Sequence, residues 1–334
     1  SARNVLPFRL TLGQRAALKT IVDDLCSSSA MNRLLQGDVG CGKTIVAVLA
    51  ALVTMENGLQ VAFMAPTELL AEQHYLSLKS LLRDSRFRVA LLTGSAKAES
   101  KRRTVMEIED GTASLVVGTH SLVQKGVRFR ALGLVVIDEQ QRFGVLQRAN
   151  LRDKGRQPDV LVMTATPIPR TLALTSYGDL DVSVIKDQPP GRVPVTTRVE
   201  TESRRDDVYA SVGQELRKGR QAYIVYPLVD ESAKVDLKAA TVMVRTITEQ
   251  FPIYKVGLLH GRMNAGEREA EMGRFVCGEL DILVATTVIE VGMDVANATV
   301  MLVEHAERFG LAQLHQLRGR VGRGSCRAYC WLLY

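Results

Sequence analysis

The segment Gly37-Asp38-Val39-Gly40-Cys41-Gly42-Lys43-Thr44 constrains the fold more than any other part of the chain. It has the pattern G-x-x-x-x-G-K-T, follows the apolar pair Leu34-Leu35 and precedes the apolar run 45–52. A glycine-rich loop between a strand and a helix aims several backbone N–H groups at one point, and the helix N-terminus adds positive potential there. The pattern therefore predicts a strand–loop–helix unit of an α/β protein with an anion site at its loop.

The residue types within the loop indicate what the anion is. The glycines let the backbone approach a phosphate, Lys43 is expected to reach the β- and γ-phosphates, and the Thr44 hydroxyl is expected to ligate Mg²⁺. The alternative is a glycine-rich turn with a chance lysine, but every fixed position of the pattern is met between a predicted strand and a predicted helix. We therefore expect residues 37–44 to bind a nucleoside triphosphate with Mg²⁺.

Composition limits the class of protein and suggests the charge of its partner. A chain of 334 residues favours two domains. No apolar run approaches the roughly 20 residues that a membrane span needs, so no membrane partner is expected. The net charge of +7 is consistent with a polyanionic partner. The five cysteines form no C-x-x-C pair and the five histidines no ligand pattern, so neither a disulfide framework nor a transition-metal site is expected.

Short apolar runs alternate with amphipathic segments in two series along the chain. The first series lies near 33–36, 60–65, 88–93, 114–117, 133–137 and 159–163, and the second near 195–199, 221–226, 254–259, 280–285, 298–303 and 327–333. This alternation predicts βαβ units and parallel sheets. The segment 187–194 holds three prolines and a glycine, so it suits neither a helix nor a central strand. We predict two tandem α/β domains, 1–186 and 195–334, each a mainly parallel sheet flanked by helices, with 187–194 as the linker.

Two acids, Asp138 and Glu139, close the apolar run 132–137. An aspartate at the carboxyl end of a buried strand, in the same domain as a phosphate loop, is where nucleotide hydrolases place the carboxylate that serves Mg²⁺. Glu139 is then expected to orient or deprotonate the attacking water. The alternative is a strand that ends in two solvated acids, and the phosphate loop earlier in the chain favours the catalytic interpretation.

Eight motifs follow one another in the order of a known enzyme superfamily: GDVGCGKT, MAPTELLAEQH (64–74), GTHSLVQ (118–124), DEQQRFGV (138–145), TATPIPRT (164–171), LLHGRM (258–263), TTVIEVGMDV (286–295) and QLHQLRGRVGRG (313–324). Together they resemble the motor of superfamily 2 helicases, and over nearly the whole chain they are most similar to the RecG family of DNA branch-migration helicases. The Mfd translocase family shares several of them, whereas MAPTELL, HGRM, TTVIEVG and PPGRVPVTT are RecG-like. The resemblance implies two RecA-like domains.

The resemblance also implies nucleotide contacts beyond the phosphate loop. Gln316, Arg320 and Arg323 match the family's Q-x-x-G-R-x-G-R motif, with Arg323 as the expected arginine finger and Arg320 as a γ-phosphate contact. A basic surface helix is the alternative explanation for these residues. Gly292 and Asp294 are expected near the nucleotide, with Asp294 at the ribose.

Residues at three further places are assigned by the same resemblance. Phe8 is expected to stack on the adenine ring, and the amide of Gln14 to pair with the edges of the base. Gln141, together with Thr164 and Thr166 of the TAT motif, is expected to couple hydrolysis to movement. Gln14 by itself would be read as an ordinary surface residue near a helix start.

DNA contacts are expected at the carboxyl ends of strands, where open α/β sheets present their ligand loops. Hydroxyl and N–H groups there would contact the phosphates and not the base edges, so binding would not depend on the DNA sequence. Taken singly, each threonine is better explained as a helix cap, and His120 as a structural histidine. The expected contacts are Thr67, Thr93, Gly94, Thr119, His120, Gly261, Arg262, Thr286 and Thr287.

The resemblance implies a monomeric motor that uses ATP and Mg²⁺ to remodel branched DNA, such as forks and Holliday junctions, in repair and recombination. Three alternatives stay open: a double-stranded DNA translocase of the Mfd kind acting in transcription-coupled repair, an RNA helicase, and a nucleotide switch without hydrolysis. Both ends of the chain look cut. The wedge domain of RecG-like proteins is expected to be missing, which would leave weak ATPase activity without efficient junction unwinding.

Position 141 departs from the family pattern, because the chain has DEQQ where bacterial RecG proteins usually have DEQH. Glutamine keeps one donor and one acceptor, so coupling through this position is expected to survive. The glutamine form resembles RecG homologues of plant chloroplasts and mitochondria. We therefore expect a plant organelle as the location, with a bacterial cytoplasm as the alternative.

Overall fold

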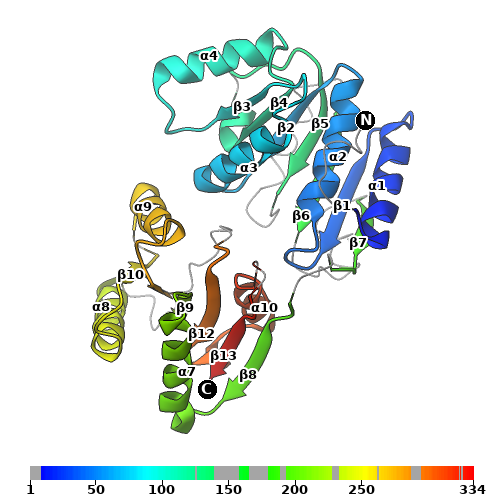
Figure 1. Ribbon diagram of the computed structural model, residues 1–334. Helices are drawn as coiled ribbons and strands as arrows, with labels where there is room; N and C mark the ends of the chain where they lie inside the picture. The colour runs from blue at the N-terminus through cyan, green and yellow to red at the C-terminus, as the bar shows by residue number, and fades with distance from the viewer. Residues whose placement is uncertain are drawn as a thin grey trace. The chain divides into compact units, whose positions relative to one another are not determined.

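The computed structural model describes residues 9–124, 126–138, 158–164, 180–188, 193–227, 233–261, 263–286, 295–322, 324 and 326–334. They divide into two compact units, Ser1–Pro189 and Pro190–Tyr334 (Figure 1). The division falls inside the segment 187–194, the expected linker. In the part of the chain that the structure describes, no helix is both long and apolar enough to cross a membrane.

The first unit is built on a seven-stranded sheet in the order β3-β4-β2-β5-β6-β1-β7, and all its described strand pairs are parallel. Its helices and strands are α1 (Leu12–Leu25), β1 (Asn32–Gly37), α2 (Lys43–Glu56), β2 (Gln60–Met64), α3 (Glu68–Leu81), β3 (Val89–Leu92), α4 (Ala98–Glu109), β4 (Leu115–Gly118), the 3-10 turn η2 (His120–Val123), β5 (Leu132–Ile137), β6 (Asp159–Thr164) and β7 (Asp181–Ile185).

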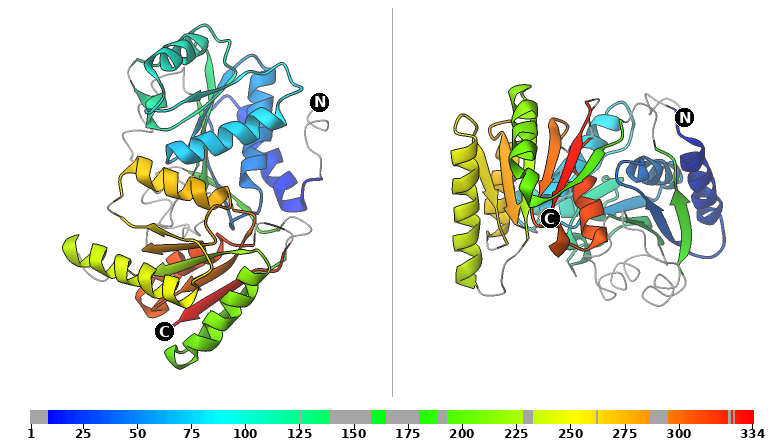
Figure 2. Two further views of the ribbon diagram at one scale, coloured as in Figure 1. Left: turned by 60° about the vertical axis from the view of Figure 1, so that its left-hand side comes forward. Right: turned by 90° about the horizontal axis from the view of Figure 1, so that it is seen from below.

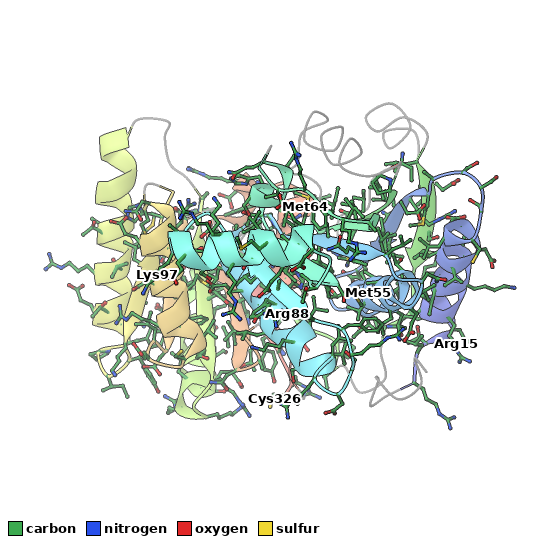
Figure 3. The ribbon with its side chains drawn as sticks, turned by 90° about the horizontal axis from the view of Figure 1, so that it is seen from above. Arg15, Met55, Met64, Arg88, Lys97 and Cys326 are labelled. Atoms are coloured by element: carbon green, nitrogen blue, oxygen red, sulfur yellow. The ribbon has the colours of Figure 1, made fainter. Side chains whose placement is uncertain are left out.

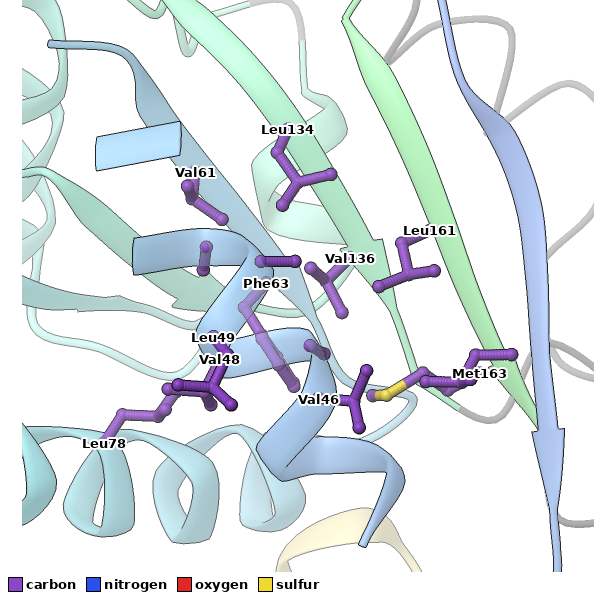
Figure 4. Close-up of a cluster of buried hydrophobic side chains, with 14 of the residues drawn as sticks. Val46, Val48, Leu49, Val61, Phe63, Leu78, Leu134, Val136, Leu161 and Met163 are labelled. Carbon is purple, nitrogen blue, oxygen red and sulfur yellow. The ribbon is translucent and has the colours of Figure 1, made fainter. Parts of the chain in front are cut away.

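Helices cover both faces of this sheet. Because successive side chains of a strand point to opposite faces, Val61 and Phe63 of β2 join a core with α1, α2 and α3, whereas Ala62 and Met64 join a second core with Ile108 of α4. Figure 4 shows the first of these cores, in which Val46 and Leu49 of α2 lie over the strands. The central strands β2, β4 and β5 are buried on both faces, which explains why they appear in the sequence as continuous apolar runs.

The two methionines labelled in this unit illustrate how closely it is packed. Met55 near the end of α2 and Met64 at the end of β2 are 3% and 0% exposed, whereas Arg15 on α1 extends into solvent (Figure 3).

Thr11 begins α1 with a capping box, since its hydroxyl accepts from the N–H of Gln14 and the Gln14 side chain accepts from the N–H of Thr11. Capping of this kind satisfies donors that a helix start would otherwise leave open.

The second unit is built on a six-stranded sheet in the order β10-β11-β9-β12-β13-β8, with parallel pairing throughout its described strands. Its elements are β8 (Thr196–Glu200), η4 (Glu202–Arg204), α7 (Arg205–Arg217), β9 (Gln221–Tyr226), α8 (Ala233–Gln250), β10 (Val256–Leu259), α9 (Ala265–Val276), β11 (Ile282–Thr286), β12 (Ala298–Val303), η5 (Ala306–Arg308), α10 (Leu311–Arg318) and β13 (Tyr329–Leu333).

Helices again cover both faces of the second sheet. Side chains of α7 and α8 share one core with Ala222 and Ile224 of β9, and Figure 2 shows both helices lying along the strands. Tyr223, which points to the other face, packs its ring against Phe275 of α9 with 4.8 Å between the ring centroids. The predicted fold class, two tandem units with parallel sheets flanked by helices, is confirmed.

The two sheets have the same strand order. Replacing each of β1 to β6 by the strand seven places later converts the order of the first sheet into that of the second, apart from the additional edge strand β7. One buried contact also recurs. Gln60 starts β2 and donates to Ile108 O at 3.0 Å and Ala113 O at 2.8 Å. Gln221 starts β9 and donates to Phe275 O at 2.6 Å and Leu280 O at 2.8 Å.

Every run expected to be a strand contains one, but β7 was not expected. This strand pairs with β1 at the edge of the first sheet, and most of its side chains are exposed or half-buried. An edge strand with mixed exposure carries a weak apolar pattern, so its sequence did not distinguish it from a loop.

Candidate nucleotide-binding site

The phosphate loop lies between the end of β1 and the start of α2, as its pattern predicts. Gly40 and Gly42 have φ angles of 76° and 86°, in the left-handed region that favours glycine. Gly42 is also the N-cap of α2, and it provides no side-chain cap to the first turn of that helix. Because the cap is a glycine, it has no side chain to place at the helix N-terminus, the end of a helix that favours an anion.

Lys43 folds back over the loop that precedes it. Its Nζ donates to the carbonyl oxygen of Gly37 at 2.7 Å and to that of Asp38 at 3.0 Å. The loop is further shaped by Asp38, whose Oδ1 accepts from the N–H of Val39 at 2.8 Å. The ammonium group is thus placed at the loop by neutral acceptors, and charged phosphate oxygens are stronger acceptors than carbonyls.

Gln14 holds the loop from α1. The Gln14 side chain is 3% exposed overall, its Oε1 accepts from Thr11 at 2.9 Å, and its Nε2 donates to Cys41 O at 2.8 Å. A Cβ atom on Gly42 would collide with this same Nε2. The structure thus gives both ends of the amide a partner within the protein, a role that the sequence did not indicate, and pairing with adenine stays a prediction.

Cys41 is packed inside the loop, with 1% of its surface exposed. A Cβ atom on Gly37 would lie 2.5 Å from the Cys41 Sγ, so the thiol occupies the space that glycine leaves at the end of β1. Burial raises the pKa of the Cys41 thiol, although the nearby Lys43 acts in the opposite direction. The thiol is therefore a packing group in this conformation.

Two further predicted residues lie at the ends of β6, the neighbour of β1, and of β5, the next strand in the sheet. Asp138 directly follows β5, and its backbone N–H donates to Met64 O at 2.9 Å. Thr164 ends β6, is 2% exposed and pairs in register with Gln36, the residue before Gly37. In a parallel sheet these carboxyl ends lie along one edge. Asp138 and Thr164 thus lie at the edge from which the phosphate loop emerges.

The residues available for a metal ion fit magnesium better than a transition metal. Among the described residues, no group of three or more His, Cys, Asp or Glu side chains could hold a metal ion. The Thr44 hydroxyl at the start of α2 and the Asp138 carboxylate are oxygen donors, the kind that Mg²⁺ prefers. An ion here would take its remaining ligands from phosphate and water, which is typical of Mg²⁺ in phosphoryl-transfer enzymes.

A histidine that the sequence analysis did not single out contacts Asp138. His74 on α3 places its Nε2 2.9 Å from the Asp138 Oδ2, and its ring packs against Phe63 with 4.7 Å between centroids. The buried residues of α3 are Leu70, Ala71 and Leu78, so His74 interrupts the apolar face of the helix. A polar residue at this position of the apolar face was the feature of the sequence from which a buried contact of His74 could have been predicted.

The strand-end residues expected to touch DNA differ in exposure. Thr93 and Thr119 are each 3% exposed, whereas Gly94 and His120 are exposed. The Thr67 hydroxyl caps α3 by accepting from the N–H of Leu70 at 3.3 Å. A DNA contact at Thr93 or Thr119 would therefore use backbone N–H groups or exposed neighbours rather than the buried side chains.

One carboxylate connects two of these strand ends. Glu68, the first residue of α3, accepts from the N–H of Gly94 at 2.7 Å and from that of Ser95 at 3.2 Å, and it also bonds the Ser95 hydroxyl. The loops after β2 and β3 are thus held together on the surface of the first unit.

The second unit positions its described site residues on and after α10. Gln316 is half-buried on that helix, and Arg320, two residues after its end, is 5% exposed. Gly322 adopts a φ of 75°, and a Cβ atom there would lie 2.9 Å from Val195 Cγ2. Gly261 is exposed after β10, and Thr286 is 4% exposed at the end of β11.

Several predicted residues lie outside the part of the chain that the structure describes, and their assigned roles stay predictions. They are Phe8, Glu139, Gln141, Thr166, Arg262, Thr287, Gly292, Asp294 and Arg323.

Comparison with known families gives two matches, one in each unit. The DEAD/DEAH box helicase family matches residues 11–175, and the helicase conserved C-terminal domain matches residues 206–325. Among curated proteins, the ATP-dependent DNA helicase RecG of Synechocystis is 54% identical over 331 residues, which is 99% of this chain and 40% of that protein. RecG of Aquifex aeolicus is 54% identical over 98% of this chain and 42% of its own. The chain spans less than half the length of these relatives.

Solved structures agree with the sequence comparison. The structure of RecG bound to a three-way DNA junction has a TM-score of 0.87 and 47% identity, and the match covers 99% of this chain and 44% of that one. The DEAD-box helicase Mss116 bound to single-stranded RNA has a TM-score of 0.71 at 18% identity, with 100% and 71% coverage. The second match shows the shared fold alone.

The expectation of a plant organelle is wrong. The RecG relatives at about half identity come from bacteria, including Synechocystis, Aquifex aeolicus, Thermotoga maritima and Streptococcus pneumoniae. The expectation rested on Gln141, a single residue whose exchange for histidine preserves a donor and an acceptor. Such an exchange is too small a chemical change to indicate the source of a chain.

Proposed function

Because this chain belongs to the RecG family of superfamily 2 helicases, we propose that it binds and hydrolyses ATP with Mg²⁺ at the loop 37–44 and uses the energy to remodel branched DNA. The observation that carries the proposal is the geometry of that loop. Two left-handed glycines open it, α2 begins without a side-chain cap, and Lys43 lies over its carbonyl groups. This combination suits a triphosphate because it supplies a helix N-terminus and a lysine ammonium group at one place.

Nucleotide binding is expected to change the partners of Lys43. Its contacts with Gly37 O and Asp38 O are charge-assisted bonds to neutral acceptors. The β- and γ-phosphate oxygens carry formal charge and would replace them. Thr44 and Asp138 would hold Mg²⁺, which supplies neutralisation of charge on the phosphates. Glu139 would orient the attacking water, and Arg320 and Arg323 would stabilise charge that develops on the transferred phosphoryl group.

The positions of the expected DNA contacts in the two sheets support a nucleic-acid role. In the first sheet, Thr67, Thr93 and Thr119 follow β2, β3 and β4, which are adjacent at one side of the sheet. In the second sheet, Gly261 and Thr286 lie at the ends of β10 and β11, which are adjacent at the corresponding side. Each sheet therefore groups its expected contacts on neighbouring strands, away from β1 or β8.

The second sheet has no phosphate loop at the position that corresponds to the first. There β8 leads to η4 and α7, whose first turn carries Asp206 and Asp207. The connection 201–204 between β8 and α7 contains no glycine, so it lacks the residues that let a backbone loop approach a phosphate closely. We therefore propose a single phosphate loop per chain, at 37–44, and the roles of Gln316, Arg320 and Arg323 stay those that the family motif assigns.

The test compares the ATPase rate with a three-way DNA junction, a linear duplex and single-stranded RNA. We expect the junction to stimulate most, and Lys43→Ala to lower the stimulated rate by about 100-fold or more. The matched control is Lys19→Ala, which removes an exposed lysine of α1 in the same unit.

Each alternative has its own signature in this experiment. Equal stimulation by junction and linear duplex would support a duplex translocase, and stronger stimulation by RNA would support an RNA helicase. ATP that stays bound and uncleaved in the presence of every nucleic acid would identify a nucleotide switch. Full activity of Lys43→Ala would refute the assignment of the loop itself.

A further inference from the structure

We infer that His74 is a positioning residue for the magnesium site, because its Nε2 fixes the carboxylate of Asp138 by a hydrogen bond. The inference rests on the proposed function, in which Asp138 serves Mg²⁺. His74 lies on α3, whereas Asp138 follows β5, so the contact joins residues that are 64 positions apart in the chain. It is made inside the first unit, and both residues belong to the described part of the chain.

The geometry of the pair is that of a directed hydrogen bond. The distance between His74 Nε2 and Asp138 Oδ2 is 2.9 Å, and the two side chains are 15% and 17% exposed. An ionised carboxylate only accepts hydrogen bonds, so Nε2 carries the proton in this contact. With little water around the pair, the bond is strong enough to choose one orientation of the carboxylate.

The ring of His74 is itself held in place. It lies 4.7 Å from the Phe63 ring at an interplanar angle of 51°, and Phe63 is 1% exposed in the middle of the core. α3 is anchored by Leu70, Ala71 and Leu78 on the same face. A rigid donor is therefore presented to Asp138 from a rigid helix, which is the arrangement that lets one side chain orient another.

Orientation matters because the χ2 angle of an aspartate is broad and the two carboxylate oxygens exchange easily. A hydrogen bond from His74 to Oδ2 holds the carboxylate plane in one orientation, so its remaining lone pairs would be presented to the ion, or to a water bound to it, in a fixed direction. Residues that hydrogen-bond to a metal-binding carboxylate typically change metal affinity or activity by 10–100-fold when they are removed. A histidine that only filled the core would have no such effect on the metal.

The experiment measures the dissociation constant of Mn²⁺, as a paramagnetic substitute for Mg²⁺, from the protein saturated with a non-hydrolysable ATP analogue. Electron paramagnetic resonance of free Mn²⁺ gives this constant without turnover. His74→Phe keeps an aromatic ring beside Phe63 but has no donor, and we expect it to weaken Mn²⁺ binding by about tenfold. His74→Gln restores a donor at a similar reach, and we expect it to stay within about twofold of the unaltered protein.

Two controls separate the possible causes. Nucleotide affinity without divalent ions should be the same in all variants, and thermal unfolding should show that each variant is folded. If His74→Phe does not fold, the comparison of His74→Leu with His74→Gln replaces it. Asp138→Asn should weaken Mn²⁺ binding whether or not His74 has a role.

The outcomes distinguish this inference from the proposed function. If Asp138→Asn weakens Mn²⁺ binding but His74→Phe does not, the role of His74 is refuted and the proposed metal site stands. Equal weakening by His74→Phe and His74→Gln also refutes it, since the ring rather than the hydrogen bond would then matter. If Asp138→Asn leaves Mn²⁺ binding unchanged, the metal site and the inference fall together.

Discussion

Replacing Gly42 with alanine should damage the phosphate loop through a named contact with α1, apart from any effect on nucleotide binding. Gly42 has a φ of 86°, and a Cβ atom there would collide with the Nε2 of Gln14. That Nε2 donates to Cys41 O at 2.8 Å inside a buried environment. Gly42→Ala should therefore break the hydrogen bond in addition to placing alanine in an unfavourable backbone conformation.

The two effects have separate magnitudes. A left-handed conformation costs a non-glycine residue about 1–2 kcal/mol. A buried donor and acceptor that lose each other cost a further 1–3 kcal/mol or so. The free energy of unfolding of the first unit should thus fall by about 2–5 kcal/mol for Gly42→Ala.

A glycine at the other end of the same helix provides the matched control. Gly58 follows α2 with a φ of 78°, and nothing lies within 4 Å of a Cβ atom placed there. Gly58→Ala should therefore show the backbone cost alone, about 1–2 kcal/mol. Urea unfolding followed by far-ultraviolet circular dichroism compares the two variants, and any coupling to the second unit affects both alike.

Gln14→Ala completes the comparison. In that background the side chain that collides with the new Cβ atom is gone, so Gly42→Ala should cost no more than Gly58→Ala. Equal costs for Gly42→Ala and Gly58→Ala in the otherwise unaltered protein would refute the reasoning. So would an extra cost of Gly42→Ala that persists after Gln14 has been removed.

Three further predictions concern the second unit. Burial raises the pKa of Cys330 to about 12, so iodoacetamide at pH 8 should modify the exposed Cys277 and spare Cys330 until the protein unfolds, as mass spectrometry of tryptic peptides can show. Burial, with Tyr226 and Glu304 nearby, also raises the pKa of Tyr209. Because an unfolded tyrosine ionises near pH 10, stability should fall as the pH rises above that value, and the fall should be shallower in Tyr209→Phe. Gln221→Ala leaves two buried carbonyl groups without their donor, so it should lower the unfolding free energy by about 1–3 kcal/mol, measured by the fluorescence of the single tryptophan in β13.

The sheets could be predicted from the sequence because parallel strands buried on both faces appear as uninterrupted apolar runs. β5, with all six residues buried, is such a run. β7 shows the limit, since only Ile185 at its end is buried and its pairing with β1 depends on tertiary context. The phosphate loop could also be predicted from the sequence, because Gly40 and Gly42 are required by the local backbone, which has positive φ angles at both positions.

Contacts between distant elements could not be predicted in this way. His74 reaches Asp138 only because β2, which precedes α3, pairs with β5. The hydrogen bond from the Gln14 Nε2 to Cys41 O likewise depends on α1 lying against α2. The spacing of residues along one helix indicates that a polar side chain lies on its buried face, but it does not identify the residue to which that side chain hydrogen-bonds.

Gln60 and Gln221 make equivalent hydrogen bonds in the two units and so identify a contact that belongs to the sheet architecture itself. Each side chain joins the start of a central strand by hydrogen bonds to the end of a helix and to the chain just before a neighbouring strand. Neither residue lies in the phosphate loop 37–44. The contacts that hold the sheet together are therefore separate from the phosphate loop, and the second unit keeps the same strand order without such a loop between β8 and α7. For protein engineers, the stretch between β8 and α7 is accordingly the place where a new ligand loop could be grafted with the least disturbance to the surrounding layers.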